Sequence, residues 1–161
     1  MIVGLSTTDH VTSKIIRAVT HADVSHAWLR FPLYGRELVL QADHRGVNLE
    51  DFGRFRSHNR VVRQYSLVNP IEDSLMHELL ERLGASYDYR GLVGNGWVLL
   101  GQAFHRHWEN PFQGEDEWYC SELVADYIMR TGQKLPAPAA AISPVALDKI
   151  LAGSPFAAVI V

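Results

Sequence analysis

The single cysteine of this 161-residue chain, Cys120, is the residue whose type and position most strongly suggest chemistry. The apolar residues that follow it recur at the spacing of one helical stripe: Leu123, Val124, Tyr127 and Ile128. Cys120 is therefore expected in the first turn of a helix. There the unpaired N–H groups and the helix macrodipole favour a thiolate over a thiol, which makes a cysteine nucleophilic near neutral pH. The alternative is a small buried apolar side chain, the commonest role of a lone cysteine.

A cysteine nucleophile needs a base that takes or shares its proton and later returns it to the leaving group. Among the eight histidines, His26 is the first choice, because it lies in an otherwise apolar and aromatic segment where a buried imidazole needs a specific partner. A core histidine with satisfied hydrogen bonds is the alternative. Three others have ordinary positions at a helix end, in a charged loop and on a polar helical face: His21, His58 and His77.

The pair His105 and His107 has the H-x-H spacing of a metal-binding segment, but no third ligand follows at a recognisable spacing. The single cysteine also excludes a cysteine-cluster metal site and an intramolecular disulfide. We therefore expect neither a metal nor a cofactor.

A third group should fix the orientation of the imidazole. The segment from Leu38 to Asp43 is predicted to be the strand next to that of His26, since only a short turn joins them. Gln41 is the polar residue inside its apolar run, and Asp43 lies on the same face by two-residue alternation. Gln41 is the first choice for this role, Asp43 the second and His44 a distant third.

Hydrophobic periodicity and turn residues predict five strands and five helices. The expected strands are residues 2–5, 24–31 (closed by Pro32), 37–42, 61–68 and 156–161. The expected helices are residues 12–20, 70–83, 92–104, 120–131 and 144–151, and residues 47–55 are expected to form a loop with one helical turn. This order predicts one α+β domain over residues 1–161, with an antiparallel sheet and helices packed largely on one side.

Composition limits the classes of partner. A formal net charge of −3 offers no basic field for nucleic acid. The N-terminus lacks a basic start and its apolar run is too short for a signal peptide, and no later run reaches membrane-spanning length. A cytoplasmic protein with a small-molecule or peptide-like substrate is expected. The sequence does not set an oligomeric state.

Several segments, in this order, resemble the circularly permuted NlpC-type cysteine hydrolases, papain-like proteins of bacteria and phages often called YiiX/YebB-like and related to the lecithin:retinol acyltransferase-like proteins. The segments are Ser25-His26-Ala27, Gln41-Ala42 with Gly46-Val47, Tyr87-Asp88, Tyr119-Cys120-Ser121-Glu122-Leu123-Val124, and Ser143-Pro144 with Leu147. The resemblance implies a permuted papain-like fold with Cys120 as nucleophile, His26 as base and Gln41 as orienting residue. The family commonly has a glutamate where this chain has Gln41, and a neutral amide stabilises an imidazolium less than a carboxylate does.

The activity that the resemblance implies is acyl transfer through a thioester, most simply hydrolysis of an amide bond in a peptide or similar substrate. Trp118 and Tyr119, which immediately precede Cys120, are expected to line the substrate cleft. Two alternatives stay open: a lipid acyltransferase or thioesterase of the lecithin:retinol type, and a binding module that keeps the fold without turnover.

Overall fold

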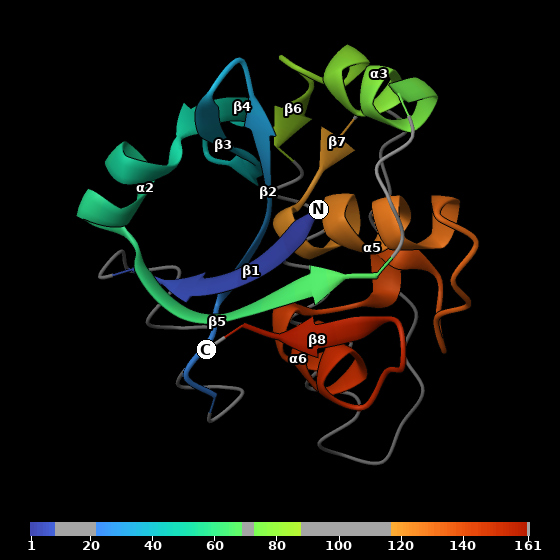
Figure 1. The fold of residues 1–161 in the computed structure, drawn as a ribbon. Coiled ribbons are helices and arrows are strands. Elements are labelled where there is room, and N and C mark those ends of the chain that lie inside the picture. The colour runs from blue at the N-terminus through green and yellow to red at the C-terminus, as the bar shows by residue number, and fades with distance from the viewer. Residues whose placement is uncertain (9–21, 69–72, 88–116, 161) are drawn as a thin grey trace.

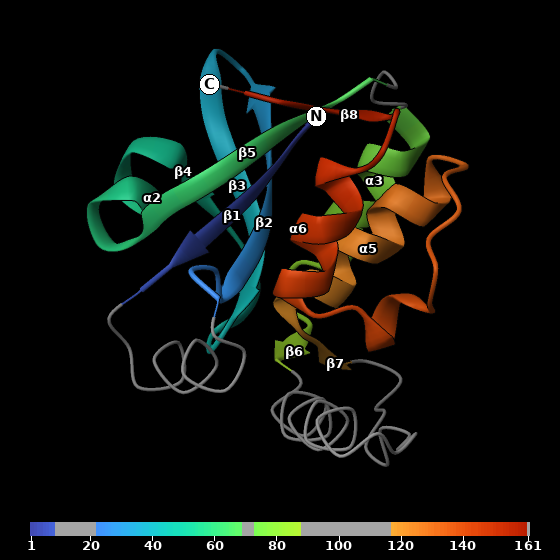
Figure 2. The same cartoon turned by 90° about the horizontal axis from the view of Figure 1, so that it is seen from below.

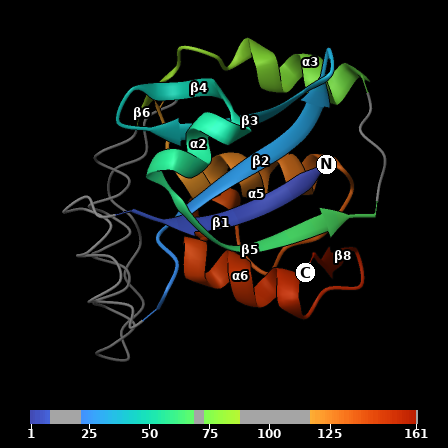
Figure 3. The same cartoon turned by 60° about the vertical axis from the view of Figure 1, so that its left-hand side comes forward.

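The computed structural model describes residues 1–8, 22–68, 73–87 and 117–160 (Figure 1). Its main feature is a six-stranded sheet in the order β4-β3-β2-β1-β5-β8, in which every neighbouring pair is antiparallel. The strands are β1 (Ile2–Thr7), β2 (His26–Leu33), β3 (Arg36–Asp43), β4 (Gly46–Asp51), β5 (Arg60–Leu67) and β8 (Ala157–Val159). Figure 3 shows β2, β1 and β5 running side by side across the molecule.

Two tight hairpins set the register of β2, β3 and β4. Tyr34 and Gly35 join β2 to β3 with φ angles of 48° and 74°, the left-handed pair typical of a two-residue hairpin turn. Gly46 begins β4 with a φ of 91°, and a Cβ there would lie 2.3 Å from the carbonyl oxygen of Ala85. The second hairpin therefore needs glycine at its end for both conformation and space.

Four α-helices lie within the described part of the chain: α2 (Phe52–His58), α3 (Asp73–Glu81), α5 (Cys120–Arg130) and α6 (Pro144–Ala152). The side chains of Asp51 and Ser143 cap α2 and α6 by accepting hydrogen bonds from the first-turn N–H groups. A short 3-10 helix, η1 (Ala139–Ala141), precedes α6, and β6 (Ser86–Tyr87) pairs in parallel with β7 (Glu117–Trp118).

The two faces of the sheet are covered differently. In Figure 2, α5 and α6 lie on one side of the sheet and α2 lies on the other. The larger apolar core lies on the α5 side and includes residues of β1, β2 and β3 together with the buried stripe of α5. A smaller cluster under α2 contains Trp28, Val39 and Phe55.

The predicted α+β class and antiparallel sheet are confirmed, and so are most of the strands and the helices that begin near Cys120 and Pro144. The loop predicted for residues 47–55 is wrong. These residues form β4 and the start of α2, because Val47 and Leu49 pair with β3 opposite Ala42 and Leu40, and Asp51 then caps the helix.

The prediction that Pro32 closes its strand is also wrong, since Pro32 pairs with Glu37 inside the hairpin of β2 and β3. β2 pairs with β1 only as far as Arg30, so a missing N–H at Pro32 costs no hydrogen bond to β1. The helices predicted for residues 12–20 and 92–104 lie outside the described residues, as do the first residues of the helix predicted for 70–83. Among the described residues, no helix combines the length and apolar character needed to span a membrane.

Candidate active site

Cys120 is the first residue of α5, where the sequence predicted it. The apolar stripe of that helix is fully buried against the sheet, and Cys120 itself is 4% exposed. The preceding residue, Tyr119, anchors the start of the helix because its hydroxyl donates to the carbonyl oxygen of Ala140 at 2.5 Å. Packing of the stripe fixes the position of the thiol, and this anchor adds a hydrogen bond at the start of the helix.

His26 is the first residue of β2, opposite Ser6 of β1. It is partly exposed, in contrast to its buried neighbours Ser25 and Ala27. Its ring stacks on Phe55 of α2 with the centroids 6.4 Å apart. His26 therefore lies at the start of a central strand, and the Phe55 ring packs against its imidazole from the α2 side.

The side chains of Cys120 and His26 interact, and each changes the pKa of the other. Burial alone would raise the pKa of Cys120, but the hydrogen bond to His26, the charge of the imidazolium and the N–H groups of Ala27 and Ser121 together lower it. Burial alone would lower the pKa of His26, but the hydrogen bond to Cys120, the thiolate charge and a hydrogen bond to Gln41 together raise it. Both shifts favour a thiolate paired with an imidazolium.

Gln41 lies on the other side of the imidazole, and its Oε1 accepts a hydrogen bond from His26 Nε2 at 2.8 Å. The second choice, Asp43, is held by Arg45, whose Nη2 lies 2.7 Å from Asp43 Oδ2. Burial by itself would raise the pKa of Asp43, but the hydrogen bonds from Arg45 lower it. The third choice, His44, is mostly exposed beside Asp43. The structure thus brings Cys120, His26 and Gln41 together and leaves Asp43 paired elsewhere.

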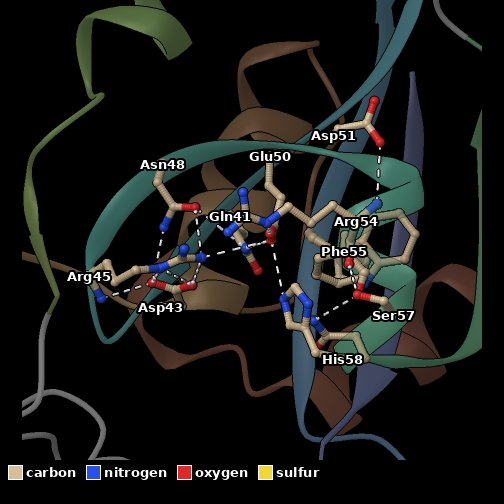
Figure 4. Close-up of polar contacts among 12 residues, drawn as sticks. Gln41, Asp43, Arg45, Asn48, Glu50, Asp51, Arg54, Phe55, Ser57 and His58 are labelled. Atoms are coloured by element: carbon tan, nitrogen blue, oxygen red, sulfur yellow. Dashed lines mark hydrogen bonds and ion pairs between the residues drawn. The ribbon is translucent and has the colours of Figure 1, made fainter.

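The residues that hold Gln41 from its other side were not predicted from the sequence. The Gln41 amide nitrogen donates to Glu50 Oε2 at 3.3 Å and to Asn48 Oδ1 at 3.4 Å, both from β4 (Figure 4). His58, predicted to have an ordinary place in a charged loop, is the last residue of α2, and its Nε2 lies 3.3 Å from Glu50 Oε2. Prediction of a strand after Gly46 would have placed Asn48 beside Gln41.

Tyr119 does not line a cleft as expected, because it is 2% exposed and its hydroxyl is bound to backbone carbonyls. Trp118 is partly buried and packs under the guanidinium of Arg82, 4.1 Å from the ring centre. The pair His105 and His107 lies outside the described residues.

No protein-family model matches this sequence, and no curated protein matches it either. Among solved structures, the chain is similar to the crystal structure of metalloprotein yiiX from Escherichia coli O157:H7. The TM-score is 0.66 at 15% sequence identity, and the match covers 99% of this chain and 94% of the other. At this identity the likeness concerns the fold.

The description of yiiX as a metalloprotein applies to that protein. In residues 1–8, 22–68, 73–87 and 117–160 of this chain, no group of three or more His, Cys, Asp or Glu side chains is placed to hold a metal ion, so these residues do not fit a metal centre. Cys120, His26 and Gln41 offer instead a series of a thiol, an imidazole and an amide, in which the imidazole and the amide are hydrogen-bonded. The chain has a YiiX-like fold, with this series where α5 meets the start of β2.

Proposed function

We propose that this chain, as one domain over residues 1–161, is a cysteine hydrolase that cleaves an amide bond of a peptide or similar substrate. The observation that carries the proposal is the series of Cys120, His26 and Gln41, in which Gln41 holds the imidazole by a hydrogen bond of 2.8 Å, the thiol pKa is lowered and the imidazole pKa is raised. A pair perturbed in this way by a specific partner is typical of catalytic sites.

In the first half of the reaction, the Cys120 thiolate attacks the carbonyl carbon and forms a C–S bond. The carbonyl electrons move to oxygen, and N–H groups in the first turn of α5, which have no acceptor within the helix, provide hydrogen bonds to that oxyanion. When the oxyanion collapses, the C–N bond breaks and the His26 imidazolium gives its proton to the departing amine. The product is a thioester on Cys120.

In the second half, a water molecule gives a proton to neutral His26 and attacks the thioester carbon. The C–S bond breaks, the acid leaves, and the thiolate–imidazolium pair is restored. Gln41 accepts from Nε2 throughout, so the other ring nitrogen stays directed to the sulfur and the attacking water. The amide carries no charge, so it orients the imidazolium without neutralising it.

The test is labelling with a peptidyl vinyl sulfone, which forms a thioether with an activated thiolate. The wild-type protein should be labelled at Cys120, the only cysteine of the chain, and labelling should fall strongly in His26→Ala. Cys120→Ser is the control for reaction elsewhere. Equal labelling of wild type and His26→Ala would exclude a catalytic pair. Labelling without turnover of any amide or thioester substrate would favour a binding module.

A further inference from the structure

The side-chain amide of Gln41 has two chemically different ends, and only one of them serves the imidazole. With Oε1 toward His26, the amide accepts from Nε2–H and leaves the other ring nitrogen for Cys120. With the amide turned over, its NH₂ group would face the ring and require Nε2 to be the acceptor. The neutral ring would then carry its proton on the nitrogen that faces the sulfur, where it cannot accept the thiol proton.

Glu50 favours the first arrangement. Its Oε2 accepts from the Gln41 amide nitrogen at 3.3 Å, and a carboxylate has no proton to donate. If the amide turned over, its oxygen would face a carboxylate oxygen. The other neighbour, Asn48, supports the same arrangement, because its Nδ2 donates to Asp43 Oδ1 and to the Gly46 carbonyl oxygen, which leaves its Oδ1 to accept from Gln41.

The Glu50 carboxylate is itself held in place. Glu50 is 7% exposed, and its two oxygens are bound from both sides by side chains of α2 and of the hairpin of β3 and β4. Arg54 Nε lies 3.3 Å from Oε1, while His58 Nε2 and Arg45 Nη2 lie 3.3 Å and 3.8 Å from Oε2. These partners leave one carboxylate oxygen directed at Gln41.

We propose that Glu50 is a positioning residue: it holds the Gln41 amide with its oxygen toward His26 and thereby selects the Nε2–H tautomer of the neutral imidazole. This inference rests on the proposed function, because a fixed tautomer matters only if His26 exchanges protons with Cys120. Glu50 touches neither reacting group. We expect it to act on His26 through Gln41, to which it is hydrogen-bonded.

The first readout is the tautomer of His26, measured from nitrogen chemical shifts in ¹⁵N-labelled protein. Cys120→Ala serves as background, because without the thiolate the ring can be observed in its neutral form at about pH 8. We expect the Nε2–H tautomer in this background and a mixture of tautomers after Glu50→Gln is added. An unchanged tautomer in Glu50→Gln would overturn the proposal.

The second readout is the alkylation rate of Cys120 at about pH 6 in the otherwise native protein. Glu50→Gln should lower the rate about fivefold, the population change that loss of one net hydrogen bond produces. Gln41→Glu added to Glu50→Gln should restore it, because a carboxylate at position 41 accepts in either orientation. A purely structural Glu50 would give a loss that Gln41→Glu does not rescue.

Two controls separate orientation from loss of an ion pair. Arg54→Gln removes a partner of Glu50 but keeps its carboxylate, and Glu78→Gln removes an ion-paired glutamate elsewhere, 2.6 Å from Arg130. Both should leave the tautomer unchanged. If wild-type Cys120 proves unreactive, the proposed function fails, whereas the tautomer measurement still decides the role of Glu50.

Discussion

The two faces of the sheet differ in what they contribute to the candidate site. The α5 face is apolar, and its helix holds Cys120 in place through packing. The α2 face carries Gln41, Asn48 and Glu50 above a small aromatic cluster, and it holds His26 through directional hydrogen bonds. The nucleophile should therefore respond mainly to changes in volume, and the base mainly to changes in polar groups.

The largest expected effect is at the junction of the two faces. His26→Ala or Cys120→Ala should lower hydrolysis of an accepted amide substrate by a factor on the order of 10³ or more, since each removes a group that acts in bond making. Initial rates with a fluorogenic peptide amide measure the loss. His44→Ala, at an exposed histidine near the site, is the matched control and should retain the wild-type rate. Wild-type turnover in His26→Ala would contradict the proposed hydrolase function.

The next largest effect is expected on stability, from a change in the apolar core on the α5 face. Leu123 is fully buried in the core, so Leu123→Ala should lower the free energy of unfolding by about 2–5 kcal/mol through lost apolar contacts and the cavity left behind. Urea denaturation provides the value. Met129→Ala changes an exposed residue of the same helix and should cost far less. Similar losses of unfolding free energy in both variants would mean that packing of the buried α5 stripe does not stabilise the protein.

On the α2 face, the closest packing involves Gly4 of β1 and Trp28 of β2. A Cβ at Gly4 would lie 2.1 Å from the Trp28 ring, so Gly4→Ala should destabilise the protein by about 1–3 kcal/mol as the indole is displaced. Thermal unfolding is the measurement. Gly153→Ala, whose added carbon would meet only ordinary contacts, is the control. An unchanged melting temperature in Gly4→Ala would contradict the packing described for this cluster.

The smallest effect concerns the anchor before α5. Tyr119→Phe removes the hydroxyl that donates to the carbonyl oxygen of Ala140, and it should cost about 0.5–1.5 kcal/mol of stability. Tyr34→Phe, at a side chain that is 97% exposed, should cost almost nothing. Because packing rather than this bond dominates on the α5 face, the alkylation rate of Cys120 should stay near that of wild type. A large fall in that rate would show that the anchor sets the thiol position.

The sequence predicted the apolar face better than the polar one. The helical stripe of α5 is visible in the sequence because burial imposes a regular period, and it placed Cys120 at a helix start correctly. The short turn after the His26 strand likewise put Gln41 on the next strand of the sheet. Glu50 was missed because the short alternation Val47-Asn48-Leu49-Glu50 was interpreted as a loop with one helical turn, and because a charged side chain gives no sign in sequence that it will be buried.

Residue spacing alone also does not decide whether Gln41 or Asp43 contacts His26. Both residues lie on one face of β3, but Arg45 in the following turn pairs with Asp43, and Gln41 is the one that reaches His26. Which of two eligible side chains meets a partner depends on local competition for hydrogen bonds. Such competition becomes visible only when the side chains are placed.

The central claim is that His26 makes Cys120 a thiolate, and the pH dependence of Cys120 alkylation by iodoacetamide tests it most directly. The shape of this profile, unlike the absolute rate, does not depend on how accessible the sulfur is. Because the pKa of Cys120 is lowered and that of His26 is raised, the wild-type rate should hold its plateau well below the pH at which an ordinary thiol ionises. In His26→Ala, the pH at which the alkylation rate reaches half of its maximum should move up toward about pH 8.5. If both proteins reach half of the maximal rate near that pH, the result would contradict the claim that His26 makes Cys120 a thiolate.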